Sequence, residues 1–212
     1  ELDRRMIGIR IKQLKEKLKK LDKQRGMQRR ARKRSNALTV SIVGYTNAGK
    51  STLFNYLTHE KILAENKLFA TLDTTSRKLF LEEGHSVVMS DTVGFIKSLP
   101  TTLIQAFKST LEEATDSDLL IHVVDISNTN KAEQIIQVDK ILKEIKAHGI
   151  PQLLVLNQID KIEIKSGYDR DEYGNIVRIQ LSAKNGNGIE FLKKAIVEFS
   201  QKHKNQRNGQ YA

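Results

Sequence analysis

The sequence predicts an α/β fold in which a doubly wound, mostly parallel six-stranded sheet follows a basic helical linker. Two observations support this fold class. Short apolar runs typical of buried strands alternate with helical stretches along residues 37–203, and the excess positive charge lies in the segment before them. We therefore divide the 212 residues into a linker (1–36), an α/β domain (37–203) and a flexible tail (204–212).

The linker is strongly basic. Residues 1–34 hold 15 of the 36 lysines and arginines and four of the 25 acidic residues, so they alone account for the net charge of +11. Its apolar residues form a helical seam at alternating spacings of four and three, at Ile7, Ile11, Leu14, Leu18 and Leu21. We interpret the linker as half of a helical hairpin with an RNA-binding basic face; the simpler alternative is a solvated charged helix.

The domain alternates predicted strands with predicted helices. The strands are expected at 37–44, as a pair within 77–94 around a tight turn at Glu83 and Gly84, and at 118–126, 152–160 and 176–182. The helices are expected near 50–58, 101–115, 131–147 and 188–203. The stretches "KSGYDRD" and "EYGNIV" are predicted to form a polar loop ahead of the last strand. In such sheets ligands bind beyond the carboxyl ends of the strands, so functional residues are expected there.

Composition excludes several classes of function. The chain has no cysteine, so disulfides, zinc–thiolate sites and thiol catalysis are excluded. The five histidines lack metal-ligand spacing, and no apolar run approaches the roughly 20 residues that span a bilayer. The chain opens with Glu1 and shows no signal peptide, so we expect a fragment of a cytoplasmic protein that binds no membrane and is a monomer when free.

A phosphate-binding motif follows the first strand. "GYTNAGKS" fits the pattern G-x-x-x-x-G-K-[ST] between a strand and a helix, whereas the alternative is a glycine-rich turn without function. Backbone N–H groups of such a loop donate to phosphates, Lys50 would reach the β- and γ-phosphates, and the Ser51 hydroxyl would ligate Mg²⁺. The predicted nucleotide-binding residues here are Gly44, Tyr45, Thr46, Asn47, Ala48, Gly49, Lys50, Ser51 and Thr52.

A carboxylate closes the third predicted strand. Asp91, in "DTVG", is placed to support Mg²⁺, and the backbone N–H of Gly94 could donate to the γ-phosphate. By itself, an aspartate at a strand end is more often a turn cap. The interpretation as a magnesium site therefore depends on the phosphate loop lying at the same edge of the sheet.

Two further motifs predict recognition of guanine. In "NQID", Asp160 can accept hydrogen bonds from the adjacent N1–H and N2–H₂ donors of guanine and would repel the N1 acceptor of adenine. Asn157 can bond the other edge of the base and tie back to the phosphate loop. In "SAK", the N–H of Ala183 could meet the guanine carbonyl. Each motif is weak alone, but four in order at strand ends indicate a guanine-nucleotide switch.

The chain resembles the HflX family of translation-factor-related P-loop GTPases. The resemblance covers "VGYTNAGKSTLFN", "FATLD", "DTVGFIKSLP", "AFKSTLEEATDSDLLIHVVD" and "SAKNGNGI" in the domain, and "ELDRRMIGIRIKQLKEKL" and "QRRARKRS" in the linker. It implies a G domain over 37–203 that hydrolyses GTP to GDP with Mg²⁺. It also implies binding to the large ribosomal subunit and its rRNA through the basic arm and the switches, and a role in splitting or rescuing ribosomes under stress. The alternative is a guanine-nucleotide-dependent RNA-binding or ribosome-assembly module with negligible hydrolysis.

The resemblance also assigns residues that spacing leaves open. It implies that Thr71 closes on Mg²⁺, although the residues alone do not choose among Thr71, Thr74 and Thr75. The implied catalytic residues are Lys50, Thr71 and Gly94, and the implied metal site is Ser51, Thr71 and Asp91. The nucleotide contacts beyond the phosphate loop would be Phe69, Ala70, Thr71, Leu72, Asp73, Asp91, Thr92, Val93, Gly94, Asn157, Gln158, Asp160, Ser182, Ala183 and Lys184.

The sequence departs from the family pattern at several points. Gln158 stands where the family usually has lysine and Thr74 where it usually has proline, so we expect weakened nucleotide affinity with guanine specificity intact. Phe95 occupies the position at which other GTPases use glutamine to orient water, and its ring has no donor or acceptor. The polar group must therefore come from elsewhere. The hypotheses are an ordering effect of the ribosome and a K⁺ ion held near Asn47.

Overall fold

The computed structural model describes residues 37–59, 75–81, 85–92, 94 and 114–209, together with the linker positions Ile7, Arg10, Gln13, Glu16 and Lys17. The chain divides into two units, Glu1–Ala37 and Leu38–Ala212. The described linker positions from Ile7 to Lys17 are helical. The predicted turn at Glu83 and Gly84 lies outside the described residues.

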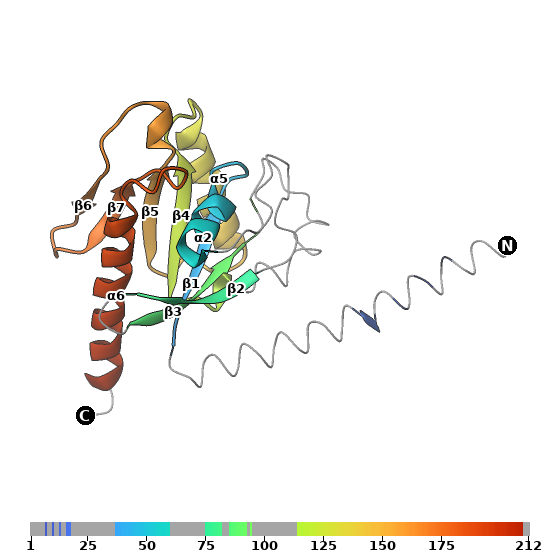
Figure 1. The fold of residues 1–212 in the computed structure, drawn as a ribbon. Coiled ribbons are helices and arrows are strands. Elements are labelled where there is room, and N and C mark those ends of the chain that lie inside the picture. The colour runs from blue at the N-terminus through green and yellow to red at the C-terminus, as the bar shows by residue number, and fades with distance from the viewer. Residues whose placement is uncertain are drawn as a thin grey trace. The chain divides into compact units, whose positions relative to one another are not determined.

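A seven-stranded sheet forms the centre of the second unit, with the strands in the order β2-β3-β1-β4-β5-β7-β6 (Figure 1). The strands are β1 (Leu38–Gly44), β2 (Thr75–Phe80), β3 (Ser86–Asp91), β4 (Leu119–Asp125), β5 (Gln152–Asn157), β6 (Gly167–Arg170) and β7 (Ile176–Gln180). The five inner strands pair in parallel, and only the edge strands β2 and β6 pair antiparallel. The predicted α/β class with a mostly parallel, doubly wound sheet is confirmed.

The prediction of six strands was wrong by one. β6 pairs antiparallel with β7 inside the segment that the sequence predicted to be a polar loop. Its last two residues, Asp169 and Arg170, are exposed, and the pairing shifts register between them. A short strand at the edge of a sheet has solvent beside it, so it lacks the apolar run by which the inner strands were recognised.

Three α-helices and one short 3₁₀ helix accompany these strands in the described part of the domain. They are α2 (Lys50–Thr58), α5 (Lys131–Glu144), η2 (Ile159–Lys161) and α6 (Ile189–Gly209). Of the helix predicted at 101–115, only the last two residues are described, and they are helical. α6 runs beyond its predicted end at 203. Within α6, Phe199 stacks on His203 with 5.8 Å between ring centroids, and His203 Nε2 lies 3.5 Å from Oδ1 of Asp118, the residue before β4.

The two faces of the sheet carry separate hydrophobic cores. Leu53 and Phe54 of α2 and Leu192 of α6 pack in the core on one face, and Val138 and Leu142 of α5 pack on the other. Successive residues of the inner strands alternate between these cores, as a strand with both faces covered requires. No helix in the described part of the chain is both long and apolar enough to cross a membrane.

His122 is buried in β4, with 3% of its surface exposed, as the sequence predicted for a core histidine. Its Nε2 has no hydrogen-bond partner among the described residues. Burial lowers the pKa of His122 to about 4; the charge of Lys50 lowers it as well, and that of Asp139 opposes the shift. Between this value and the ordinary 6.5, the unfolded chain binds more protons than the folded chain, so stability falls as pH falls through this window.

We therefore expect the free energy of unfolding to drop by about 1.6 kcal/mol between pH 6.5 and pH 5, with a slope that steepens toward roughly 1.4 kcal/mol per pH unit as pH falls. Urea unfolding at a series of pH values measures this. His122→Leu should flatten the dependence, whereas His148→Leu, at an exposed histidine, should retain it. An equally steep slope in the His122 variant would show that other groups cause it.

Candidate nucleotide-binding site

The loop between β1 and α2 places a buried amine at the carboxyl edge of the sheet. Lys50, the first residue of α2, is only 6% exposed, and its Nζ donates a hydrogen bond to the Tyr45 carbonyl at 2.9 Å. Burial lowers the pKa of Lys50 to about 8, and the charge of Asp91 opposes this shift. The backbone of Gly94 lies close by, since a Cβ there would be 2.9 Å from Lys50 Nζ and 2.9 Å from Thr46 Cγ2. The ammonium group, the loop and Gly94 therefore converge.

A hydroxyl and a carboxylate meet beside this amine. The Ser51 hydroxyl donates to Asp91 Oδ2 at 2.8 Å, and Asp91, at the end of β3, is 1% exposed. The next residue, Thr92, is fully buried, and its hydroxyl donates to the Ile42 carbonyl of β1 at 2.7 Å. The chain that leaves β3 is thus fixed to β1, directly below the phosphate-binding loop. Ser51 and Asp91 form an oxygen pair of the kind that Mg²⁺ binds.

Asn157 links the phosphate-binding loop to the loop after β7. It closes β5 and is 2% exposed. Its Nδ2 donates to the Ala48 carbonyl at 2.9 Å, and its Oδ1 accepts from the Ala183 N–H at 2.9 Å. The predicted tie to the phosphate loop is therefore present. The N–H of Ala183 was predicted to meet the guanine carbonyl, and in the structure its acceptor is Asn157.

Asp160 and Gln158 make two further hydrogen bonds between the loops around the site. The Ser182 hydroxyl donates to Asp160 Oδ1 at 2.6 Å, which holds the carboxylate against the loop after β7. Gln158 adopts a positive φ of 68°, and its Nε2 donates to the Asn47 carbonyl at 3.0 Å. Asn47 itself has φ 61°. The residues after β5 therefore bond both to the phosphate loop and to the loop that begins at Ser182.

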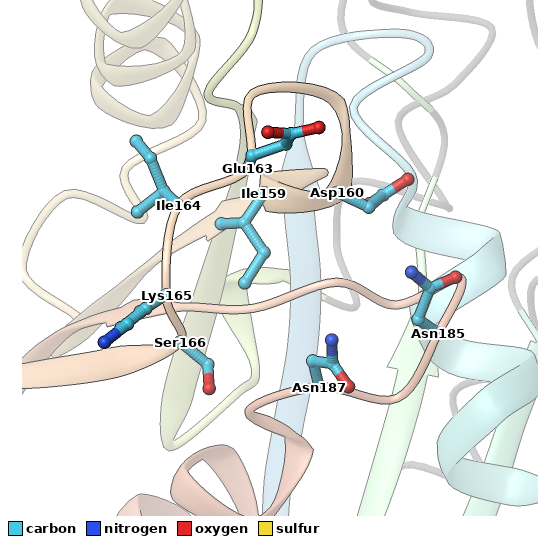
Figure 2. A pocket seen from close by; sticks show the side chains of 8 residues that line it. All are labelled: Ile159, Asp160, Glu163, Ile164, Lys165, Ser166, Asn185 and Asn187. Atoms are coloured by element: carbon cyan, nitrogen blue, oxygen red, sulfur yellow. The ribbon is translucent and has the colours of Figure 1, made fainter.

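A pocket of about 560 Å³ opens beside Asp160 (Figure 2). It lies between the segment 159–166 and the loop that leads into α6, whose Asn185 and Asn187 contribute to the lining. The other lining side chains are Ile159, Asp160, Glu163, Ile164, Lys165 and Ser166. Asp160 therefore lines a concave surface at the carboxyl edge of the sheet.

Several predicted site residues lie outside the described residues, namely Phe69, Ala70, Thr71, Leu72, Asp73, Val93 and Phe95. Gly44, Thr52 and Lys184 are described, and the first two flank the phosphate loop at the end of β1 and within α2. Sequence reasoning did not single out Tyr56 of α2, which lies against Gly186 in the loop after β7. No sequence signal marks this contact, because Tyr56 belongs to no motif and only the packing of the chain brings it there.

The comparison with known families decides the family of this chain. Residues 39–158 match the family described as "50S ribosome-binding GTPase". The chain belongs to this GTPase family. Among its similar relatives is the GTPase HflX of Caldanaerobacter subterraneus subsp. tengcongensis, which is 50% identical over 92% of this chain and 44% of the relative. The GTPase HflX of Escherichia coli (strain K12) is 46% identical over 93% and 47%. The predicted resemblance to HflX proteins is confirmed, although this GTPase chain spans less than half the length of these relatives.

A solved structure adds a neighbour with nucleotide bound. The GTP-binding protein from the hyperthermophilic archaeon Sulfolobus solfataricus in complex with GDP is 30% identical, with a TM-score of 0.60 over 78% of this chain and 53% of that chain. The fold of this GTPase-family chain therefore matches that of a protein whose solved structure contains GDP.

Proposed function

We propose that this chain is a GTP-binding and GTP-hydrolysing switch that associates with the large ribosomal subunit and acts in splitting or rescuing ribosomes under stress. The observation that carries the proposal is the pair of hydrogen bonds made by Asn157, which link the Ala48 carbonyl to the Ala183 N–H. They set a loop suited to phosphates at a fixed distance from a carboxylate suited to guanine. The family match and the HflX relatives support the same function.

Each end of the site has a chemical role in this proposal. At the phosphate end, the backbone N–H groups of the loop and the ammonium group of Lys50 bind the β- and γ-phosphates, and the Gly94 N–H donates to the γ-phosphate. At the base end, Asp160 accepts from N1–H and N2–H₂ of guanine, and the hydroxyl of Ser182 holds the carboxylate in place. A carboxylate has no donor for the N1 acceptor of adenine, so ATP is disfavoured.

The residues present fit a magnesium ion. Mg²⁺ in nucleotide sites keeps several waters and takes few protein ligands beside the phosphates, so the Ser51 hydroxyl with Asp91 behind it is sufficient on the enzyme side. When bound, the ion would neutralise charge that develops on the phosphate oxygens. Thr71 stays a predicted further ligand, and a K⁺ ion near Asn47 stays a hypothesis.

Nucleotide selectivity tests the proposed function directly. Fluorescent GDP and ADP analogues are titrated into the chain with Mg²⁺, and the release of phosphate from GTP and from ATP is compared. We expect binding and turnover with the guanine nucleotide only. Equal affinity for the two diphosphates would contradict the role of Asp160.

Gln158 offers a test of the affinity of the site. Its neutral amide donates to the Asn47 carbonyl, whereas a lysine would make a charge-assisted bond, which is roughly twice as strong, and would place a longer aliphatic stem near the purine. We expect Gln158→Lys to tighten GDP binding by about three- to tenfold, or roughly 1 kcal/mol, in calorimetric titration. Gln152→Lys adds the same charge at an exposed position at the opposite end of β5 and should leave affinity unchanged. Weaker binding by the Gln158 variant would show that the amide is the better partner for the loop.

A further inference from the structure

Tyr56 of α2 lies directly on the backbone of Gly186. A Cβ on Gly186 would be 2.0 Å from Tyr56 Oη, 2.6 Å from Cζ and 3.0 Å from Cε2, so the ring fills the space that any side chain would need. Gly186 also has a φ of 83°, which side chains rarely adopt. Two independent features therefore require glycine here. The positive φ is a property of the loop itself, whereas the ring contact comes from a separate element, α2.

The contact at Gly186 reaches the base end of the site through a closed turn. The Gly186 N–H donates to the Ser182 carbonyl at 2.8 Å, and the Ser182 N–H donates to the Asn187 carbonyl at 2.9 Å. Ser182 in turn bonds Asp160, and its neighbour Ala183 bonds Asn157. A displacement of Gly186 would therefore move the groups that hold the carboxylate.

The other end of the contact belongs to the phosphate-binding helix. Tyr56 and Lys50 lie in the same nine-residue helix, whose buried residues Leu53, Phe54 and Leu57 fix it against the sheet. Tyr56 is 42% exposed, so its ring is not part of that core. The ring instead reaches from this helix to Gly186 in the loop after β7.

We propose that Tyr56 is a positioning residue for guanine-nucleotide binding. Its ring sets the distance between α2, which begins with Lys50 and Ser51, and the loop from Ser182 to Asn187, so that phosphate and base contacts are available together. The inference rests on the proposed function and assigns to Tyr56 a role in retaining the nucleotide. The role needs the outer end of the ring, at Cζ and Cε2, and requires no hydrogen bond from the hydroxyl.

The test is the rate at which a fluorescent GDP leaves the chain in the presence of Mg²⁺. We expect Tyr56→Ala to raise this rate by about tenfold, because affinity changes within one site appear mainly in dissociation. Tyr56→Phe keeps Cζ and Cε2 and should stay within about twofold of the unmodified chain, which is the rescue that a ring contact predicts. Tyr173→Ala removes a tyrosine that is 77% exposed and should change nothing.

A double-mutant cycle with Gly186 isolates the contact. Gly186→Ala introduces both a clash with the ring and backbone strain, whereas in the Tyr56→Ala background only the strain remains. The acceleration of GDP release by Gly186→Ala should therefore be at least about threefold smaller in that background. Unfolding in urea without nucleotide confirms that all variants are folded at the temperature of the assay.

The possible outcomes distinguish the proposed function from the positioning role of Tyr56. If the unmodified chain fails to bind GDP, the proposed function and this inference are both overturned. If it binds GDP but Tyr56→Ala releases it at the unmodified rate, or the effects of the two substitutions are additive, only the positioning role is overturned. The positioning role is supported if Tyr56→Ala releases GDP faster, Tyr56→Phe restores the unmodified rate, and Gly186→Ala has a smaller effect in the Tyr56→Ala background.

Discussion

Purified large ribosomal subunits are expected to raise GTP turnover by this chain by about 10³- to 10⁵-fold, the size of effect that a group supplied in trans has in other GTPases. The reason is Phe95, which stands where a water-orienting side chain is expected and has no polar atom. Lys50 and the phosphate loop can hold GTP without placing the water that attacks it. Multiple-turnover assays of phosphate release, with and without the subunits, measure the effect.

Two controls sharpen this measurement. Small subunits at the same concentration should give no stimulation, and Lys50→Ala should abolish turnover under both conditions because the ammonium group no longer reaches the phosphates. If large subunits bind but turnover stays at the slow intrinsic rate, the alternative function is favoured, in which guanine nucleotide controls RNA binding or ribosome assembly with negligible hydrolysis. If they do not bind, docking requires parts of the relatives' length that this chain does not span.

Replacing Asp160 with asparagine should exchange guanine for xanthine as the preferred base. The variant loses a charged acceptor for two donors of guanine, and hydrogen bonds to charged groups contribute roughly 1.5–3 kcal/mol each, so GDP affinity should fall at least about 100-fold. Xanthine carries a carbonyl in place of the 2-amino group, and the asparagine amide can donate to it. Titration with GDP and with xanthosine diphosphate measures both changes.

Asp160→Asn changes the contact with the base while it preserves the bond between Asp160 and Ser182. Asparagine keeps an Oδ1 that can still accept from the Ser182 hydroxyl, so the bond at 2.6 Å between the two loops is retained. Asp169→Asn changes an aspartate of the edge strand that pairs with Arg178 and is 48% exposed, and it should leave both affinities unchanged. Loss of GDP binding without gain of xanthosine diphosphate would indicate that Asp160 acts through loop structure instead of base contact.

Much of the site could be predicted from the sequence because buried parallel strands are apolar runs that end in a recognisable residue. Gly44, Asp91 and Asn157 each close such a strand, and parallel strands bring their carboxyl ends to one edge. The tie from Asn157 to the phosphate loop followed from the same reasoning. The predictions of guanine and Mg²⁺ as ligands rest on side-chain chemistry at those ends.

The parts that could not be predicted depend on packing or on exposure. β6 carries no apolar signal because it lies at the sheet edge, and its pairing with β7 becomes visible only once β7 is placed. The bond from the Ala183 N–H to the Asn157 side chain was not predicted, because it depends on how two loops pack together; the contact of this N–H with the guanine carbonyl stays a prediction. Tyr56 lies outside every motif, and its contact with Gly186 joins two segments that are distant in the sequence.

The bonds around Asn157 also affect how the chain folds. Asn157 and Ala48 are 109 residues apart, and Ser51 and Asp91 are 40 apart, so the nucleotide site exists only when most of the sheet is assembled. A partly folded chain lacks the complete site, so nucleotide binding stabilises the fully folded chain by mass action. At a free concentration of 100 times the dissociation constant, this linkage adds about 2.7 kcal/mol to the free energy of unfolding. A bound nucleotide would therefore stabilise the folded chain in addition to acting as the signal of a switch.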